Sequence, residues 1–186
     1  MGSRERKIEA DKLLYDFKLL GKLNEYGKAY IIGSYQMDMM AWNDLDIYVD
    51  NEHMSLEKVY QLSDFIMKTF HPVWYEAKQD IIDGKRCYFQ GFETEILGEI
   101  WNVDIWFFDN DKIKSAQKYC DDIYNKTKND ENIRRTIVDI KQDLISSGLY
   151  SFEMYRSVDV YDAVLNYHIK TADELIEKYS EHRSKD

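Results

Sequence analysis

The spacing of apolar and polar positions divides the chain into an α/β first half and a helical second half. Over residues 4–26 apolar side chains recur every three to four positions, and charged side chains fill the positions between them. This spacing predicts one amphipathic helix, because residues three or four apart share a helical face. Gly27 follows it, as is typical of a helix end. Two short apolar runs, 29–32 and 45–49, then predict strands.

Further signals extend this pattern to the end of the chain. Ser55 is a helix-capping residue in front of a helical pattern that runs to about Phe70. Segments 73–77, 86–92 and 99–108 are expected to be strands, and Asp83-Gly84 predicts a hairpin turn between two of them. After that the pattern predicts helices only, at 111–126, 130–147, 157–168 and 172–183. We therefore expect an α+β fold with an α/β core at 1–110 and a C-terminal helical region at 111–186 packed on it.

The composition indicates a globular protein in a reducing compartment. Hydrophobic residues make up 44% of the chain and aromatic residues 15%, enough to build a core. The two cysteines, Cys87 and Cys120, show no CxxC spacing, which argues against a disulfide framework or a zinc cluster. The chain shows no apolar stretch long enough to span a membrane and no apolar segment of a signal peptide. We expect a cytoplasmic protein without a membrane partner.

The charge balance changes the expected partners. The formal net charge is −10 and no basic run occurs, whereas a general nucleic-acid binder is expected to show a basic face. We therefore expect no nucleic-acid partner. A negative field favours cationic partners, of which Mg²⁺ is one. The ordinary alternative is that the charge only keeps the protein soluble.

Two acidic residues at the start of a strand are the first candidates for chemistry. Asp44 and Asp46 flank Leu45, and side chains two positions apart in a strand point to the same face. Two neighbouring carboxylates repel each other unless a cation neutralises them, and hard oxygen ligands suit Mg²⁺. Nine residues earlier, an apolar strand ends in Gly33-Ser34. There a glycine allows close approach of a ligand, and the Ser34 hydroxyl and N–H can contact a phosphate.

A third carboxylate lies in the last strand. Asp104 is surrounded in sequence by apolar residues, and a carboxylate buried there alone would be costly. If this strand lies beside 45–49, Asp104 joins Asp44 and Asp46. Three carboxylates can hold two metals, or one metal with a general base left over. On its own, Asp104 would more often be a charge that protects an edge strand from aggregation.

These three motifs resemble the nucleotidyltransferase superfamily typified by DNA polymerase beta. Ile32-Gly33-Ser34, Asp44-Leu45-Asp46-Ile47 and Val103-Asp104-Ile105 occupy its three motif positions in the same order. Within the superfamily the chain looks most similar to small bacterial enzymes that modify aminoglycosides and lincosamides. The resemblance implies a small mixed β-sheet flanked by helices, followed by a C-terminal helical segment.

The resemblance also implies a role for each residue. Asp44 and Asp46 would bind Mg²⁺ and the nucleotide phosphates, Ser34 and Gly33 would contact the β- and γ-phosphates, and Asp104 would be a third metal ligand or the catalytic base. The reaction implied is transfer of a nucleoside monophosphate, AMP from ATP, onto a hydroxyl of a small molecule such as an antibiotic. Relatives often complete the acceptor pocket with a second subunit, which keeps a homodimer open. Four basic residues are candidates for holding the triphosphate: Lys85, Arg86, Arg134 and Lys141.

Two other functions compete with this interpretation. A metal-dependent glycosyltransferase could use Asp44-Leu45-Asp46 to hold a sugar nucleotide. However, only 43 residues precede the pair, which leaves little room for a nucleotide domain. The other is a non-catalytic module with the same fold, such as the partner half of a toxin–antitoxin pair, which predicts no turnover and a large exposed apolar patch.

Overall fold

The computed structural model describes residues 2–50 and 54–183. The chain forms two compact units, Met1–Asp122 and Ile123–Asp186. We call them the sheet unit and the helical unit. The division lies inside a helix, α5 (Asn110–Thr127). No helix in the described part of the chain is long and apolar enough to cross a membrane.

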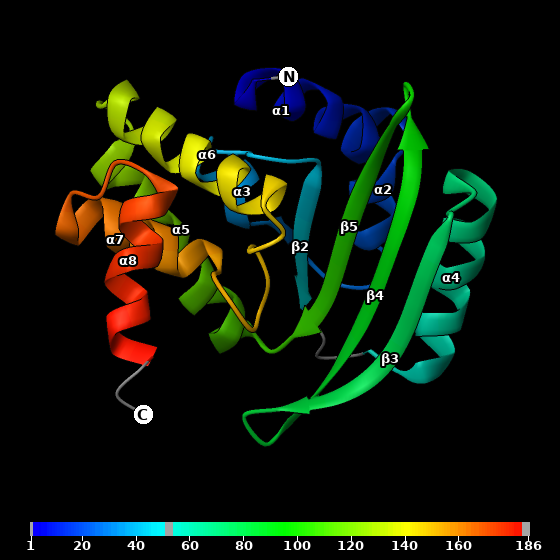
Figure 1. Ribbon diagram of the computed structural model, residues 1–186. Helices are drawn as coiled ribbons and strands as arrows, with labels where there is room; N and C mark the ends of the chain where they lie inside the picture. The colour runs from blue at the N-terminus through cyan, green and yellow to red at the C-terminus, as the bar shows by residue number, and fades with distance from the viewer. Residues whose placement is uncertain (1, 51–53, 184–186) are drawn as a thin grey trace. The chain divides into compact units, whose positions relative to one another are not determined.

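A mixed five-stranded sheet organises the first unit (Figure 1). Its spatial order is β1-β2-β5-β4-β3. The pairing of β2 with β5 is parallel, and the three other pairings are antiparallel. The strands are β1 (Ala29–Ile31), β2 (Asp44–Asp50), β3 (Trp74–Ile82), β4 (Lys85–Ile96) and β5 (Glu99–Phe108). The predicted α+β class with a small mixed sheet is therefore confirmed, and the strand at 99–108 stands where it was expected.

The hairpin of β3 and β4 is longer than the sequence indicated. The predicted strands were 73–77 and 86–92, but pairing runs without a break from Trp74↔Glu93 to Ile82↔Lys85. The polar residues of the outer half of β3 have no apolar alternation, so the periodicity ends before the strand does. The turn at Asp83-Gly84 is confirmed, and both of its residues have positive φ.

The predicted helix 4–26 is broken into three pieces in the structure. These are α1 (Ser3–Asp11), a π-helical turn (Lys12–Asp16) and α2 (Leu19–Leu23). The break is at Lys18, which adopts a left-handed conformation with φ of 61°. The apolar face continues across the break, which explains why the spacing suggested a single helix.

The other helices correspond closely to the predicted ones. In α4 (Leu56–Phe70) the N-cap is Ser55, whose side chain accepts a hydrogen bond from the Lys58 amide. A single turn, α3 (Gly33–Gln36), follows β1. In the helical unit, after the end of α5, helix α6 packs against both α7 and α8. They are α6 (Glu131–Ser146), α7 (Ser157–Tyr167) and α8 (Ala172–Arg183).

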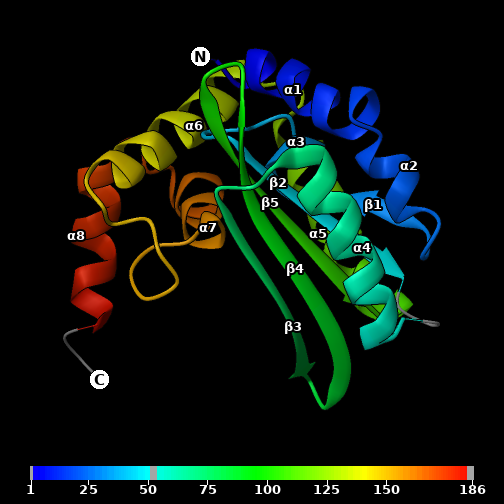
Figure 2. The same ribbon diagram turned by 90° about the vertical axis from the view of Figure 1, so that its right-hand side faces the viewer.

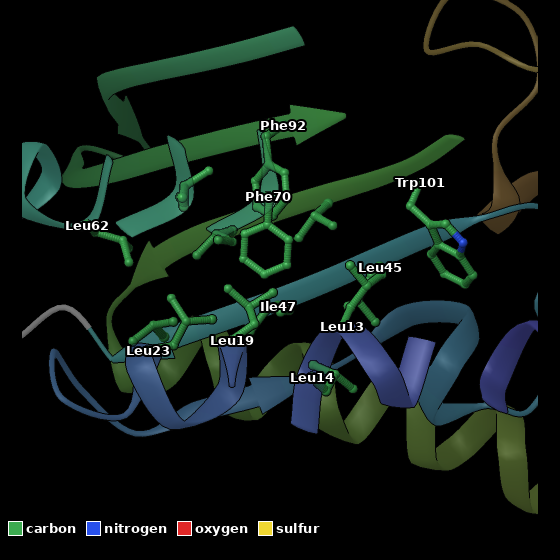
Figure 3. Packing of buried hydrophobic residues seen from close by; sticks show 14 of the residues in the cluster. Leu13, Leu14, Leu19, Leu23, Leu45, Ile47, Leu62, Phe70, Phe92 and Trp101 are labelled. Atoms are coloured by element: carbon green, nitrogen blue, oxygen red, sulfur yellow. The ribbon is translucent and has the colours of Figure 1, made fainter. Parts of the chain in front are cut away.

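The main core lies on one face of the sheet, under α1, α2 and α4. In Figure 3 the leucines of the N-terminal helices point toward Leu45 and Ile47 of β2, and Phe70 of α4 points toward Phe92 of β4. Every second residue of β2 is buried in this core, beginning at Leu45. The residues between them must therefore point to the opposite face, away from α4 (Figure 2).

Candidate active site

The three candidate carboxylates lie on the face of the sheet that is opposite the main core. The strand register pairs Asp46 of β2 with Asp104 of β5. The same row continues to Gly91 of β4 and then to Glu76 of β3. We call these four residues the acidic row. Because neighbouring strands are about 4.8 Å apart, the row brings Asp46 beside Asp104 although 57 residues separate them in sequence.

Gly33 is placed against Asp46 at the end of this row. The amide of Ile32 donates to the Asp46 carbonyl at 3.0 Å, so the residue before Gly33 is bonded to β2. Gly33 has φ of +66°, and a Cβ atom there would lie 2.3 Å from Oδ2 of Asp46. Any side chain at this position would overlap the carboxylate. The structure therefore brings the glycine of the first motif into contact with the second acidic residue of the next.

Ser34 follows as the second residue of α3 and is buried. Behind it, the backbone of Gly33 hydrogen-bonds to the thiol of Cys120, which comes from α5. Burial raises the pKa of this thiol, and that hydrogen bond opposes the rise. The turn between β1 and α3 is thus held by β2 on one side and by α5 on the other.

Asn102 was not identified from the sequence, and it links two of the carboxylates. It is the register partner of Asp44, and its Nδ2 donates to Oδ1 of Asp44 at 2.8 Å. It also hydrogen-bonds to the side chain of Asp104, two residues further along β5 on the same face. An asparagine two residues before the third acidic position is the only sequence signal for this role. The amide keeps Asp44 and Asp104 connected without adding a charge.

Burial and neighbouring charges raise the pKa values of two groups in the site, Asp104 and Tyr48. Burial raises the pKa of Asp104 above its ordinary value, the Asn102 hydrogen bond opposes this, and the charge of Glu76 adds to the rise. Burial together with the charges of Asp46 and Asp104 raises the pKa of Tyr48 to about 12. Each carboxylate therefore makes a negative charge nearby less favourable, which a bound cation would reverse.

The donor chemistry fits Mg²⁺, but the side chains do not form a closed cage. Three carboxylates on one face supply the hard oxygens that Mg²⁺ prefers. Among the residues that the structure describes, however, no three His, Cys, Asp or Glu side chains are grouped closely enough to hold a metal ion together. The structure thus brings Asp46 and Asp104 into one row and links Asp44 to Asp104 through Asn102. Their part as metal ligands stays a prediction.

Two of the basic candidates for the triphosphate lie elsewhere on the sheet unit. Lys85 and Arg86 line a small cavity of about 170 Å³ together with Cys87 and Phe108. Cys87 lies four residues along β4 from Gly91, roughly 13 Å at the rise of a strand. Lys85 is also paired with Asp109, at 3.3 Å. This position does not bring Lys85 next to the acidic row.

Comparison with solved structures identifies the fold. A cytoplasmic RNA terminal U-transferase matches with a TM-score of 0.57 at 18% identity, over 89% of this chain and 49% of that one. A Cid1 poly(U) polymerase with Mg and 3′-dATP bound matches with a TM-score of 0.61 at 16% identity, over 88% and 49%. The non-canonical poly(A) polymerase complex GLD-2–GLD-3 matches with a TM-score of 0.51 at 15% identity, over 96% and 58%.

These comparisons establish the fold and correct two expectations. The chain has the nucleotidyltransferase fold, as predicted, and spans about half the length of the transferases it matches. They do not support the narrower resemblance to aminoglycoside and lincosamide enzymes. No protein-family model and no curated protein sequence matches the chain.

The exclusion of a nucleic-acid partner is wrong, because the matched structures are RNA terminal transferases and poly(A) polymerases. That exclusion relied on the net charge of −10. Net charge describes the whole surface and does not exclude a local binding site.

Proposed function

We propose that the protein is a Mg²⁺-dependent nucleotidyltransferase, which moves a nucleoside monophosphate from a nucleoside triphosphate to a hydroxyl group. The observation that carries this proposal is the acidic row with Gly33 closed against Asp46. The fold shared with terminal uridylyltransferases and poly(A) polymerases supports it. The row supplies carboxylates for the cation of a metal–triphosphate, at the edge where α3 begins.

Each residue of the site has a proposed task. Asp44, Asp46 and Asp104 would hold Mg²⁺, which would neutralise the phosphates and the charge that develops during transfer. Gly33 and Ser34 contact the β- and γ-phosphates. The acceptor oxygen attacks the α-phosphorus, the bond to the β-phosphate oxygen breaks, and pyrophosphate leaves. The hydroxyl proton would pass to Asp104, which the strand register places beside Asp46.

We propose the 3′ hydroxyl of an RNA as the acceptor, because RNA terminal transferases and poly(A) polymerases share this fold. A small hydroxylated acceptor is the second candidate. The net charge of −10 and the acidic residues around the site favour it, because they repel a polyanion. The nucleotide is equally open to ATP and UTP.

The test is release of pyrophosphate from labelled ATP or UTP with Mg²⁺, in the presence of ribo-oligonucleotides or of small hydroxylated compounds. We expect extension of an oligonucleotide by the wild type. Asp46→Asn should lose at least about a hundredfold in rate, in the range seen when one preorganised electrostatic group is removed.

Asp50→Asn is the matched control, because Asp50 lies on the same face of β2 but pairs with Phe108, four residues beyond the acidic row. Its rate should stay near that of the wild type. Equal rates for wild type and Asp46→Asn would overturn the metal assignment. Absence of transfer to every acceptor, with either nucleotide, would overturn the proposed function.

A further inference from the structure

The geometry of phosphoryl transfer determines where the acceptor must lie. Attacking and leaving oxygens stand roughly in line on opposite sides of the phosphorus. In the proposed reaction, pyrophosphate leaves from the Gly33–Ser34 edge, beside β2. The acceptor therefore approaches from the other end of the acidic row, across Gly91 of β4 and toward β3.

At that end, two aromatic rings close over a glycine. Gly91 is the register partner of Asp104. A Cβ atom on Gly91 would lie 2.6 Å from the ring of Phe89 and 3.1 Å from the ring of Trp74. No side chain can fill this position without moving a ring. The surface next to Asp104 is consequently formed by these two aromatic rings and not by a side chain at position 91.

Of the two rings, Trp74 is the one that a ligand can reach. Phe89 is buried, because it packs against Trp106 with ring centroids 4.6 Å apart and lies under the ammonium group of Lys78 at 5.1 Å. Trp74 is 42% exposed although it is a large aromatic side chain on a regular strand. An exposed aromatic ring beside a catalytic carboxylate is suited to stacking on a planar group.

We propose that Trp74 stacks on the base of the 3′-terminal nucleotide of a single-stranded RNA acceptor, an inference that rests on the proposed nucleotidyl transfer. The row supplies the direction: from Asp46 through Asp104 and Gly91, the next strand out is β3. Lys78 lies two residues beyond Glu76 and four beyond Trp74 on the same face of β3, and brings a cation to the backbone of the same RNA strand. Its ion pair with Glu76, at 3.0 Å, is exposed enough to be exchanged for a phosphate.

The experiment compares two oligonucleotides that differ only at the 3′ end. One ends in an ordinary nucleotide and the other in an abasic nucleotide that keeps its hydroxyl. Fluorescence anisotropy gives the dissociation constant of each without nucleotide or turnover, and a transfer assay gives the KM. For the wild type we expect the abasic end to bind roughly tenfold more weakly, as expected for the loss of one base–aromatic stack.

The variant Trp74→Ala should bind both oligonucleotides equally and about as weakly as the wild type binds the abasic one. Trp74→Phe should restore part of the difference. Ile81→Ala is the matched control, because Ile81 is an exposed apolar residue of the same strand on the opposite face. Its preference for the ordinary end should equal that of the wild type. If Trp74 had only a structural role, Trp74→Ala would weaken the binding of both oligonucleotides to the same extent.

The outcomes separate this inference from the proposed function. If the wild type does not distinguish the two ends, or if Trp74→Ala keeps the difference, the stacking role is wrong while transfer to an acceptor can still stand. Transfer to small hydroxylated compounds alone, without oligonucleotide binding, likewise overturns the inference. Failure of the proposed function itself would appear separately, as the absence of Mg²⁺-dependent transfer to every acceptor with either nucleotide.

Discussion

Gly33 and Asp46 constrain each other at the scale of single residues. Gly33 needs a left-handed backbone, and its α-carbon lies so close to the Asp46 carboxylate that a methyl group would overlap Oδ2. A glycine chosen only for a turn would tolerate alanine at a modest cost in strain. Here alanine would displace the carboxylate as well, so the two motifs act as one structural feature.

Asp104 gives a prediction about stability and pH. Its pKa is raised in the folded protein, chiefly by burial. A raised carboxyl pKa adds stability that is complete below the unfolded value of about 3.9 and is lost as the pH rises through the folded value. At pH 7 the ionised side chain therefore destabilises the metal-free protein. Asp104→Asn should raise the melting temperature in EDTA at neutral pH, because the amide leaves no buried charge at this position.

The gain should shrink toward zero near the unfolded pKa of about 3.9, where the wild-type carboxyl is also neutral. Differential scanning calorimetry over this pH range measures it. Glu95→Gln, an exposed substitution on β4, is the control and should change little at any pH. A loss of stability for Asp104→Asn at neutral pH would contradict the destabilising effect attributed to the ionised Asp104 side chain.

The residues of the candidate site differ in how far sequence could identify them. Asp44, Asp46 and Asp104 could be proposed because a carboxylate inside an apolar strand is costly and therefore conspicuous. Asn102 and Gly91 carry no such signal, since an asparagine or a glycine in a strand has many explanations. Their places become clear only from the register, which pairs Asn102 with Asp44 and Gly91 with Asp104. Register depends on contacts between distant segments, which periodicity does not encode.

At the scale of elements, a buried polar network connects α4 to the hairpin of β3 and β4. Gln90 is fully buried, and its Nε2 lies 2.8 Å from the Val59 carbonyl and 2.9 Å from both Ser63 Oγ and Tyr75 OH. Its Oε1 has no hydrogen-bond partner in the described part of the chain. The amide thus fixes where α4 sits on the strands that carry Gly91 and Trp74.

Gln90→Met should lower the free energy of unfolding by about 2 kcal/mol, because it keeps the volume but removes the buried hydrogen bonds that Nε2 donates. Chemical denaturation measures this. Gln79→Met, an exposed glutamine on β3, is the matched control and should stay within about 0.5 kcal/mol of the wild type. A variant at position 90 as stable as the wild type would show that the network does not hold α4.

The elements themselves were mostly predictable, and the exceptions have local causes. Helices with caps or clear apolar stripes, such as α4 behind Ser55, begin and end near the expected residues. The prediction of one N-terminal helix was wrong because Lys18 adopts a left-handed backbone conformation. A lysine in the sequence does not indicate that conformation. Strand β3 was too short in the prediction because its polar outer half is held by pairing to β4 rather than by burial.

At the scale of the whole molecule, the negative net charge disfavours binding of RNA, whereas the inferred acceptor surface favours it. A basic protein that neutralises six or more phosphates loses roughly a thousandfold or more in affinity between about 50 and 200 mM salt. This chain carries a net charge of −10, and the acceptor surface inferred above offers Lys78 as a phosphate contact. Recognition of RNA would then depend on stacking and on the metal–nucleotide, with little help from counterion release.

We therefore predict a shallow salt dependence for an oligonucleotide acceptor. One phosphate contact on a single strand gives a slope of about −0.7 in a plot of log affinity against log salt, which is less than threefold over a fourfold change in salt. Long-range repulsion from the acidic surface is screened as salt rises and offsets part of even this loss. KM for the oligonucleotide, measured at constant free Mg²⁺ between about 50 and 200 mM KCl, should therefore change by less than about threefold. A thousandfold loss would mean that a basic surface outside the acidic row binds the RNA, and Lys78→Ala would then leave the slope unchanged. If instead the slope is shallow and Lys78→Ala brings it close to zero, then Lys78 makes the one phosphate contact that responds to salt. The rest of the affinity for the oligonucleotide then comes from stacking and the metal–nucleotide.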